Sequence, residues 1–150
     1  MDYALLREEL KAFGETDPWF VPLLSNASAL LFESLPDLNW AGFYLMRDGE
    51  LVLGPFQGKA ACIRIAVGKG VCGTAVKEDR TVRVANVHAF PGHIACDSAS
   101  NSELVIPIRK EGRVVGVLDL DSPSLDRFSK EDEKGLEAFV RTLESLIQFS

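Results

Sequence analysis

The sequence predicts an α+β fold, with a central antiparallel sheet and N-terminal and C-terminal helices packed on one side. Apolar residues recur at helical spacing near both ends of the chain, and runs of strand character fill its middle. Two short turns, Asp48-Gly49 and Glu111-Gly112, join neighbouring runs as hairpins, which makes the sheet antiparallel. At 150 residues, of which 47% are hydrophobic and 25% charged, the chain is expected to form one domain over residues 1–150.

Two helices are predicted before the strands begin. Residues 5–13 place apolar side chains at helical spacing, and Gly14 is expected to end this first helix. Asp17 followed by Pro18 suits the N-cap and first position of a second helix. Its apolar face continues over residues 20–35, so this helix is expected to pack on the core.

Six runs of strand character separate these helices from a C-terminal one. The runs cover residues 40–46, 51–56, 63–67, 81–87, 104–108 and 114–120, with a glycine-rich turn and a short helix between the third and the fourth. Ser129 with Asp132 three residues later is the pattern of a capping box, and it opens an amphipathic helix that extends to Ile147. The stretch 88–102 has no period, and a loop of this length inside a compact domain is usually functional.

The charge balance excludes several classes of partner. The formal net charge of −6 at pH 7 gives a surface that repels phosphate backbones, so we expect no nucleic-acid partner. No apolar stretch reaches the roughly 20 residues of a membrane span, and the N-terminus does not resemble a signal peptide. A cytoplasmic protein without a membrane partner is therefore expected, in a compartment where a disulfide is more often catalytic than structural.

The three cysteines could be reactive, structural or metal-binding. Cys62, Cys72 and Cys96 lack the zinc-motif spacing, which places two cysteines two to four residues apart. A site that adds His88 or His93 is the alternative, but we expect no metal. Free cysteines are often simply buried small hydrophobes. That interpretation suits Cys72, in a packed turn that leads into a helix, and suits Cys96 least, in the polar loop without a period.

The carboxylates point to a cationic ligand. Asp119 and Asp121 are two residues apart in a strand, so both side chains lie on one face. Glu103 and Asp121 each lie about nine residues from Gly112, so a hairpin there sets them across from each other. Three clustered carboxyls would raise at least one pKa and would welcome an ammonium group. A solvated acidic strand end is the equally weighted alternative.

Two aromatic residues share a face of the first predicted strand. Trp40 and Tyr44 are four residues apart, which is two repeats of the pleat. Most aromatic residues in strands belong to the core, so a core position is the default interpretation of both. The alternative is a wall that packs on an apolar or sulfur-containing ligand.

Several segments together resemble one enzyme family. They are GPFQGKAACIRI, GKGVCGTA, FPGHIACDSASNSELVIPI and GVLDLDSP, together with DPWFVPLLSNASALLFESLPDLNWAGFYL near the start. This set closely resembles the free methionine-(R)-sulfoxide reductases, a branch of the GAF-domain fold. The resemblance covers almost the whole chain, and the three cysteines, the glutamate and the paired aspartates all match. It implies a single GAF domain.

The resemblance implies reduction of free methionine-(R)-sulfoxide to methionine through a cysteine sulfenic acid and an intramolecular disulfide. It further implies thioredoxin as reductant and a homodimer, and we expect no cofactor. Cys96 matches the nucleophile, Cys62 the resolving cysteine, and Cys72 a third cysteine that can join secondary disulfides. Glu103, Asp119 and Asp121 match the carboxylates that hold the ammonium and polarise the sulfoxide. Of these three, Glu103 and Asp121 are also expected to be catalytic. Trp40 and Tyr44 match pocket-wall aromatics.

Two other functions compete with the reductase. A GAF-type module could sense a small molecule without converting it, and a thiol redox sensor could use the disulfide itself as its signal. Replacing Cys62 and Cys96 with serine separates a sensor of small molecules from the enzyme, because such a sensor would keep its ligand affinity.

Overall fold

The computed structural model describes residues 1–94, 96 and 98–150, which contain a six-stranded sheet. The strands are β1 (Trp40–Arg47), β2 (Glu50–Gly58), β3 (Arg64–Ala66), β4 (Val82–Val84), β5 (Ser102–Lys110) and β6 (Arg113–Ser122). Their order in the sheet is β3-β2-β1-β6-β5-β4, and every neighbouring pair is antiparallel. The predicted antiparallel sheet is confirmed.

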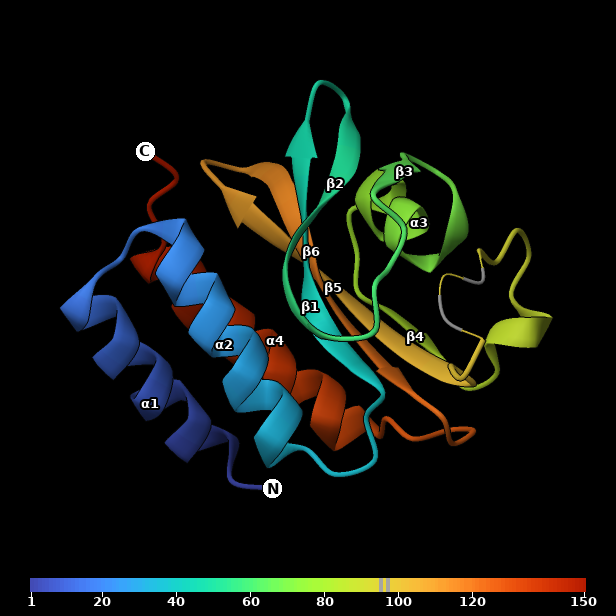
Figure 1. Cartoon of the computed structure of the whole chain (residues 1–150), viewed down its shortest axis with the longest axis horizontal. Coiled ribbons are helices and arrows are strands. Elements are labelled where there is room, and N and C mark those ends of the chain that lie inside the picture. The colour runs from blue at the N-terminus through green and yellow to red at the C-terminus, as the bar shows by residue number, and fades with distance from the viewer. Residues whose placement is uncertain (95, 97) are drawn as a thin grey trace.

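The helices lie in two places around the sheet (Figure 1). Helices α1 (Tyr3–Thr16), α2 (Phe20–Ser34) and α4 (Lys130–Leu146) cover one face, as predicted for the N-terminal and C-terminal helices. Helix α3 (Gly70–Glu78) packs against the opposite face, and a short 3₁₀ helix (Val87–Ala89) follows β4. No helix in the described residues combines the length and the apolar character that crossing a membrane requires.

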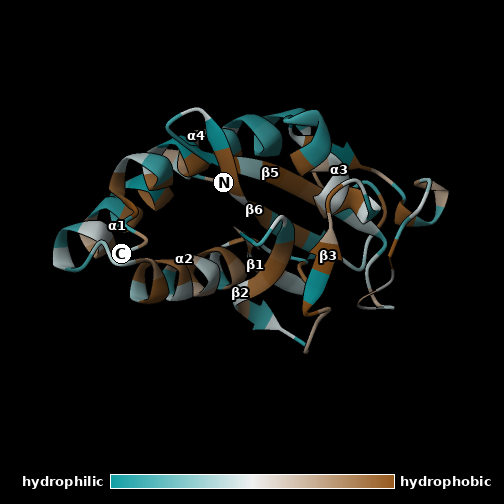
Figure 2. Cartoon of the chain, turned by 90° about the horizontal axis from the view of Figure 1, so that it is seen from above, coloured by the Kyte–Doolittle hydropathy of each residue, from teal (hydrophilic) through white to brown (hydrophobic). Residues whose placement is uncertain are grey.

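The sheet separates two hydrophobic cores because successive strand residues point to opposite faces. On the α1–α2–α4 side, Phe43, Ile106 and Leu118 pack against buried residues of the three helices. On the α3 side, Trp40 and Tyr44 pack with residues of α3 and the edge strands. Strands β1 and β5 are mostly hydrophobic in Figure 2, whereas the outward sides of α1 and α4 are polar. The smaller core, under α3, surrounds the pocket described below.

Two predicted helix ends differ from the structure. Helix α1 continues through Gly14 to Thr16, because Gly14 is buried against Leu146 of the C-terminal helix, where a larger side chain would crowd it. Helix α2 begins at Phe20, so Asp17 is not its N-cap; the Asp17 carboxylate accepts a hydrogen bond from the backbone N–H of Trp19 instead (3.0 Å). The capping box at the start of α4 is confirmed.

Both predicted hairpin turns have the backbone that their residues favour. Asp48 and Gly49 have φ values of 53° and 81°, and Glu111 and Gly112 have 54° and 75°. Two successive residues with positive φ are typical of the type I′ turn, whose twist matches that of paired strands. The second turn joins β5 to β6, and these two strands carry the acidic residues of the site.

Candidate active site

A pocket lies between the sheet and α3, on the face opposite the other helices. It is lined by Trp40, Tyr44, Ala61, Ile65, Lys69, Gly70, Val71, Cys72, His93, Ile94, Cys96, Ser100, Glu103, Asp119 and Asp121. Of the eight residues singled out in the sequence, seven line this pocket, and Cys62 is joined to it through a disulfide with Cys96. The cavity measures about 40 Å³.

Strand pairing brings the three carboxylates together. Glu103 of β5 lies directly across from Asp121 of β6, and Asp121 lies across from Trp40 of β1. Asp119 pairs with Val105 and shares its face with Asp121. The three carboxylate residues are each 6–8% exposed, so the alternative of a solvated acidic strand end is wrong. The β5–β6 hairpin thus builds a buried acidic cluster at the bottom of the pocket.

Burial and mutual repulsion disfavour negative charge in this cluster. Burial raises the pKa of Glu103 well above its ordinary range, and the neighbouring Asp119 and Asp121 carboxyls raise it further. Burial also raises the pKa of Asp119. The thiol of Cys72 has a raised pKa because it is buried and because it faces the same carboxyls. Within the described residues, the Oδ1 atom of Asp119 is buried and makes no hydrogen bond. The cluster therefore has unused capacity for a cationic ligand.

Replacing Glu103 with glutamine is expected to change how the stability of the fold depends on pH. Because the pKa of Glu103 is raised in the folded protein, its contribution to stability is present below the ordinary value of 4.5 and is lost as pH rises through the folded pKa. Glutamine does not titrate, so the variant should gain stability relative to the parent between pH 5 and pH 8. Urea unfolding of both oxidised proteins at these pH values measures this; parallel pH profiles would contradict it.

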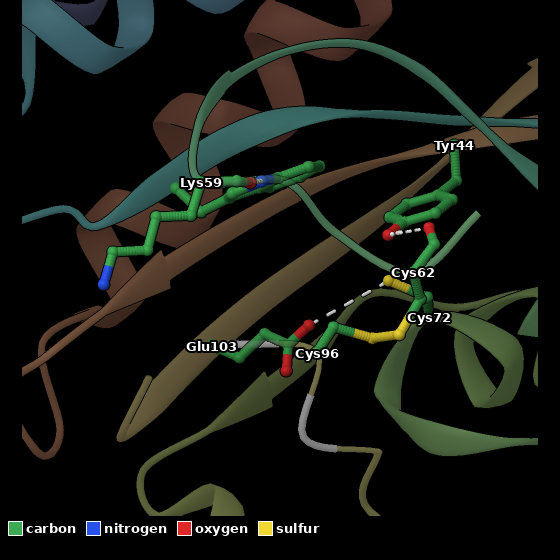
Figure 3. The surroundings of a disulfide bond; sticks show 7 residues. Tyr44, Lys59, Cys62, Cys72, Cys96 and Glu103 are labelled. Atoms are coloured by element: carbon green, nitrogen blue, oxygen red, sulfur yellow. Dashed lines mark hydrogen bonds between the residues drawn. A yellow bond between two sulfur atoms is a disulfide. The ribbon is translucent and has the colours of Figure 1, made fainter. Parts of the chain in front are cut away.

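A disulfide closes one side of the pocket (Figure 3). Cys62 and Cys96 are joined with their Cα atoms 5.4 Å apart, although 34 positions separate them in the sequence. Cys72 is a buried free thiol near the start of α3 and donates a long hydrogen bond to Oε2 of Glu103 (3.9 Å). The pocket therefore brings together a disulfide, a third cysteine as a free thiol, and a buried carboxyl group.

The two pocket aromatics belong to a larger aromatic stack than the sequence indicated. The Trp40 ring stacks between Tyr44 and Phe56, with ring centroids 5.8 Å and 5.1 Å apart. Trp40 and Tyr44 are each only 2% exposed, so they belong to the core and also line the pocket. The stacking of Phe56 on Trp40 could not be predicted from the sequence, because it depends on the pairing between β1 and β2.

The loop after β4 adds residues that sequence reasoning did not assign. His93 and Ser100 line the pocket beside Cys96. Burial lowers the pKa of His93, and the nearby His88 lowers it further. His88 bonds to the side chain of Asn101 (2.9 Å) and so ties the start of this loop to its end. No signal in the sequence indicates that His93 lines the pocket, so its position could not be predicted.

One group of side chains could hold a cation. Cys72, Glu103 and Asp119 each offer a ligand atom, and these atoms lie within 4.8 Å of one another. A thiolate with two carboxylates is a donor set that Zn²⁺ accepts. The three ligands come from α3, β5 and β6, so no local spacing could have predicted the group. The expectation of a protein without a metal stays a prediction.

Comparisons with known proteins agree on the family of this fold. The family model described as a GAF domain matches residues 24–148. An Escherichia coli protein named free methionine-R-sulfoxide reductase is 53% identical over 145 residues, which cover 97% of this chain and 88% of that protein.

Solved structures give the same result. The chain is similar to the reduced form of fRMsr of Staphylococcus aureus, with a TM-score of 0.94, 50% identity, and coverage of 98% of this chain and 96% of that one. A free methionine-R-sulfoxide reductase of Neisseria meningitidis, solved in complex with its substrate, gives a TM-score of 0.92 at 41% identity, covering 95% and 86% of the two chains.

Proposed function

This chain belongs to the GAF-domain family and, within it, to the free methionine-R-sulfoxide reductases, and we propose that it reduces free methionine-R-sulfoxide to methionine in the pocket under α3. One observation supports this most strongly: the Cys62–Cys96 disulfide lies beside three buried carboxyl groups. A sulfoxide reductase that acts on a free amino acid needs both a thiol and a counter-charge for the ammonium.

The carboxyl cluster is proposed to select the free amino acid. The substrate's ammonium would bind among Glu103, Asp119 and Asp121, where burial disfavours negative charge. A methionine sulfoxide within a peptide has no such ammonium and would bring no positive charge to the cluster. Trp40 and Tyr44 offer an apolar wall for the methylthio end of the substrate. Selectivity would therefore come from the attraction between the ammonium and the buried carboxyl cluster.

The chemical step is proposed to start at Cys96. Its thiolate attacks the sulfoxide sulfur and forms an S–S bond while the oxygen takes up a proton. The hydroxyl then moves to the Cys96 sulfur as the S–S and S–O bonds break, which leaves a sulfenic acid on Cys96 and releases methionine. The oxygen must be protonated during this transfer. Glu103 suits that role because burial and the neighbouring carboxyls raise its pKa and so favour its protonated form. Asp121, directly across from Glu103, is proposed to assist in polarising the sulfoxide.

The second half of the cycle is proposed to use Cys62. The Cys62 thiol condenses with the Cys96 sulfenic acid, releasing water and forming the disulfide. A dithiol protein of the thioredoxin class would then reduce this disulfide by thiol–disulfide exchange. Cys72 is not in that bond, and its position beside Glu103 makes it a candidate for secondary disulfides only after the pocket rearranges.

An acidic pocket disfavours a thiolate, and the substrate is proposed to remove this conflict. Neighbouring negative charge raises the pKa of a thiol, as it does for Cys72. A bound ammonium would offset that charge, so Cys96 would ionise more readily once the free amino acid is in place. Productive binding would follow reduction, because Cys96 is a free thiol only after the Cys62–Cys96 disulfide is broken.

The proposed reaction is tested by supplying three substrates separately, with thioredoxin, thioredoxin reductase and NADPH. The substrates are free L-methionine-R-sulfoxide, its S epimer and the N-acetylated R form. We expect turnover with the free R epimer alone. Binding of that epimer without NADPH consumption or methionine formation would instead support a sensor.

Replacing Asp121 with asparagine is expected to weaken the discrimination between free and N-acetylated ligands. Loss of a charge-assisted hydrogen bond should lower the ratio of their affinities about 10- to 100-fold. Calorimetric titration of the reduced protein with methionine and with N-acetylmethionine measures the ratio without requiring turnover. A ratio equal to that of the parent would remove Asp121 from ammonium recognition.

A further inference from the structure

The segment that carries Cys62 lies outside the regular elements, between the end of β2 and the start of β3. Two side chains of β1 hold it from the pocket side. The indole N–H of Trp40 donates to the backbone carbonyl of Lys59 (3.1 Å), and the hydroxyl of Tyr44 donates to that of Cys62 (2.9 Å). Figure 3 shows the Tyr44 hydroxyl directed at the Cys62 carbonyl beside the disulfide.

The ends of the segment are fixed as well. Gly58 approaches the indole so closely that a Cβ built there would lie 2.6 Å from Cδ1 of Trp40. On the far side, the carbonyl of Ile63 accepts a hydrogen bond from the backbone N–H of Leu53 (2.9 Å). Three hydrogen bonds therefore attach the segment 59–63 to β1 and β2, while the backbone N–H of Cys96 bonds within its own loop, to the carbonyl of Ile94 (3.1 Å).

We propose that Tyr44 and Trp40 are positioning residues for the resolving cysteine, holding the 59–63 segment so that the Cys62 sulfur stays within reach of Cys96. The two aromatics then have two functions, as a wall of the pocket and as the anchor of the second thiol. Their own anchorage suits this, because both are buried and stacked in the centre of the sheet. The role of Cys62 as resolving cysteine rests on the function proposed above.

The anchors act before the disulfide forms, by restricting the segment that carries Cys62. When Cys96 is a sulfenic acid, disulfide closure breaks its S–O bond and the S–H bond of Cys62, forms the S–S bond, and releases one water. A free segment would lose conformational entropy in that step, whereas an anchored one has already lost it. The anchors should therefore raise both the rate of closure and the equilibrium preference for the disulfide.

The test replaces Tyr44 with phenylalanine, which keeps the ring and removes the hydroxyl. Equilibration with defined ratios of reduced and oxidised dithiothreitol, followed by mapping of the Cys62–Cys96 bond, gives the equilibrium constant. Loss of one hydrogen bond should lower it about three- to tenfold, equivalent to about 15–30 mV for this two-electron couple. After stoichiometric oxidation of the dithiol form by hydrogen peroxide, the dimedone-reactive sulfenic acid should also persist about three- to tenfold longer.

Two further variants keep the test decisive. Tyr3→Phe removes the only other tyrosine hydroxyl, which bonds to Asp132 far from the pocket, and should leave the equilibrium constant unchanged. Gly58→Ala crowds the Trp40 indole, because its Cβ would lie 2.6 Å from Cδ1, and by displacing this anchor it should weaken the disulfide as Tyr44→Phe does. Parental values in Tyr44→Phe, or an equal shift in Tyr3→Phe, would overturn the proposal. Neither measurement uses methionine sulfoxide, so a failed reductase assay and a failed anchor remain separate results.

Discussion

Replacing Cys96 with serine is expected to abolish methionine formation, with a loss of at least about 10³-fold. The serine hydroxyl is nearly isosteric with the thiol, so the pocket should keep its shape. It is a far weaker nucleophile, and it has no stable state equivalent to a sulfenic acid that a second thiol could resolve. The measurement is methionine formed from the free R sulfoxide with dithiothreitol, which removes any dependence on a protein reductant.

The other two cysteines provide the matched controls. Cys62→Ser, reduced and then freed of dithiothreitol, should still form one methionine per chain, because the first step needs only Cys96, and should then stop with a trappable sulfenic acid. Cys72→Ser should continue to turn over, since Cys72 is the free thiol and lies outside the Cys62–Cys96 bond. Full activity of Cys96→Ser, or loss of the first turnover in Cys62→Ser, would reverse the assignment of nucleophile and resolving cysteine.

Replacing Glu103 with glutamine should produce the second largest loss, about 10²- to 10⁴-fold in the rate of the first turnover. Glutamine fills the same space and can still hydrogen-bond, but it cannot deliver a proton to the departing oxygen. The raised pKa of Glu103 also predicts the pH profile of the parent protein: the rate of this step should fall as pH rises through that pKa. Stopped reactions of the reduced protein at several pH values measure both effects.

The control for this variant is a glutamate of the same chemistry outside the pocket. Glu15 is exposed near the end of α1, on the opposite side of the sheet, so Glu15→Gln should retain the parental rate and pH profile. A Glu103→Gln protein that forms methionine at the parental rate would show that another group protonates the oxygen. Asp119, whose pKa is also raised by burial, would then be the group to examine.

The acidic cluster could be predicted from the sequence, but the reason it forms could not. Counting from Gly112 sets Glu103 across from Asp121, and the structure has this pair. The turn itself pairs Lys110 with Arg113, and that register alone would set Glu103 across from Leu120, in the helix-side core. An irregularity between Ile108 and Arg109 shifts the pairing by one residue and restores the acidic pair. No local residue pattern predicts that bulge.

Contacts between distant segments account for the rest of what was missed. The stacking of Phe56 on Trp40 depends on the β1–β2 register, and the hydrogen bonds to Lys59 and Cys62 depend on a segment without periodicity. Helix α2 starts later than Asp17-Pro18 indicated because the Asp17 carboxylate bonds locally to Trp19 instead of capping the helix. Helix and strand identities followed from periodicity, whereas these contacts required the fold.

The most direct test of the central claim is a single turnover without reductant. The protein is fully reduced, freed of reductant and mixed with excess free methionine-R-sulfoxide, after which methionine and the Cys62–Cys96 disulfide are quantified in the same sample. The account predicts one methionine and one such disulfide per chain, and neither product with the S epimer. Methionine without this disulfide would contradict the assigned cycle, and binding without methionine would contradict the proposed reaction in this pocket.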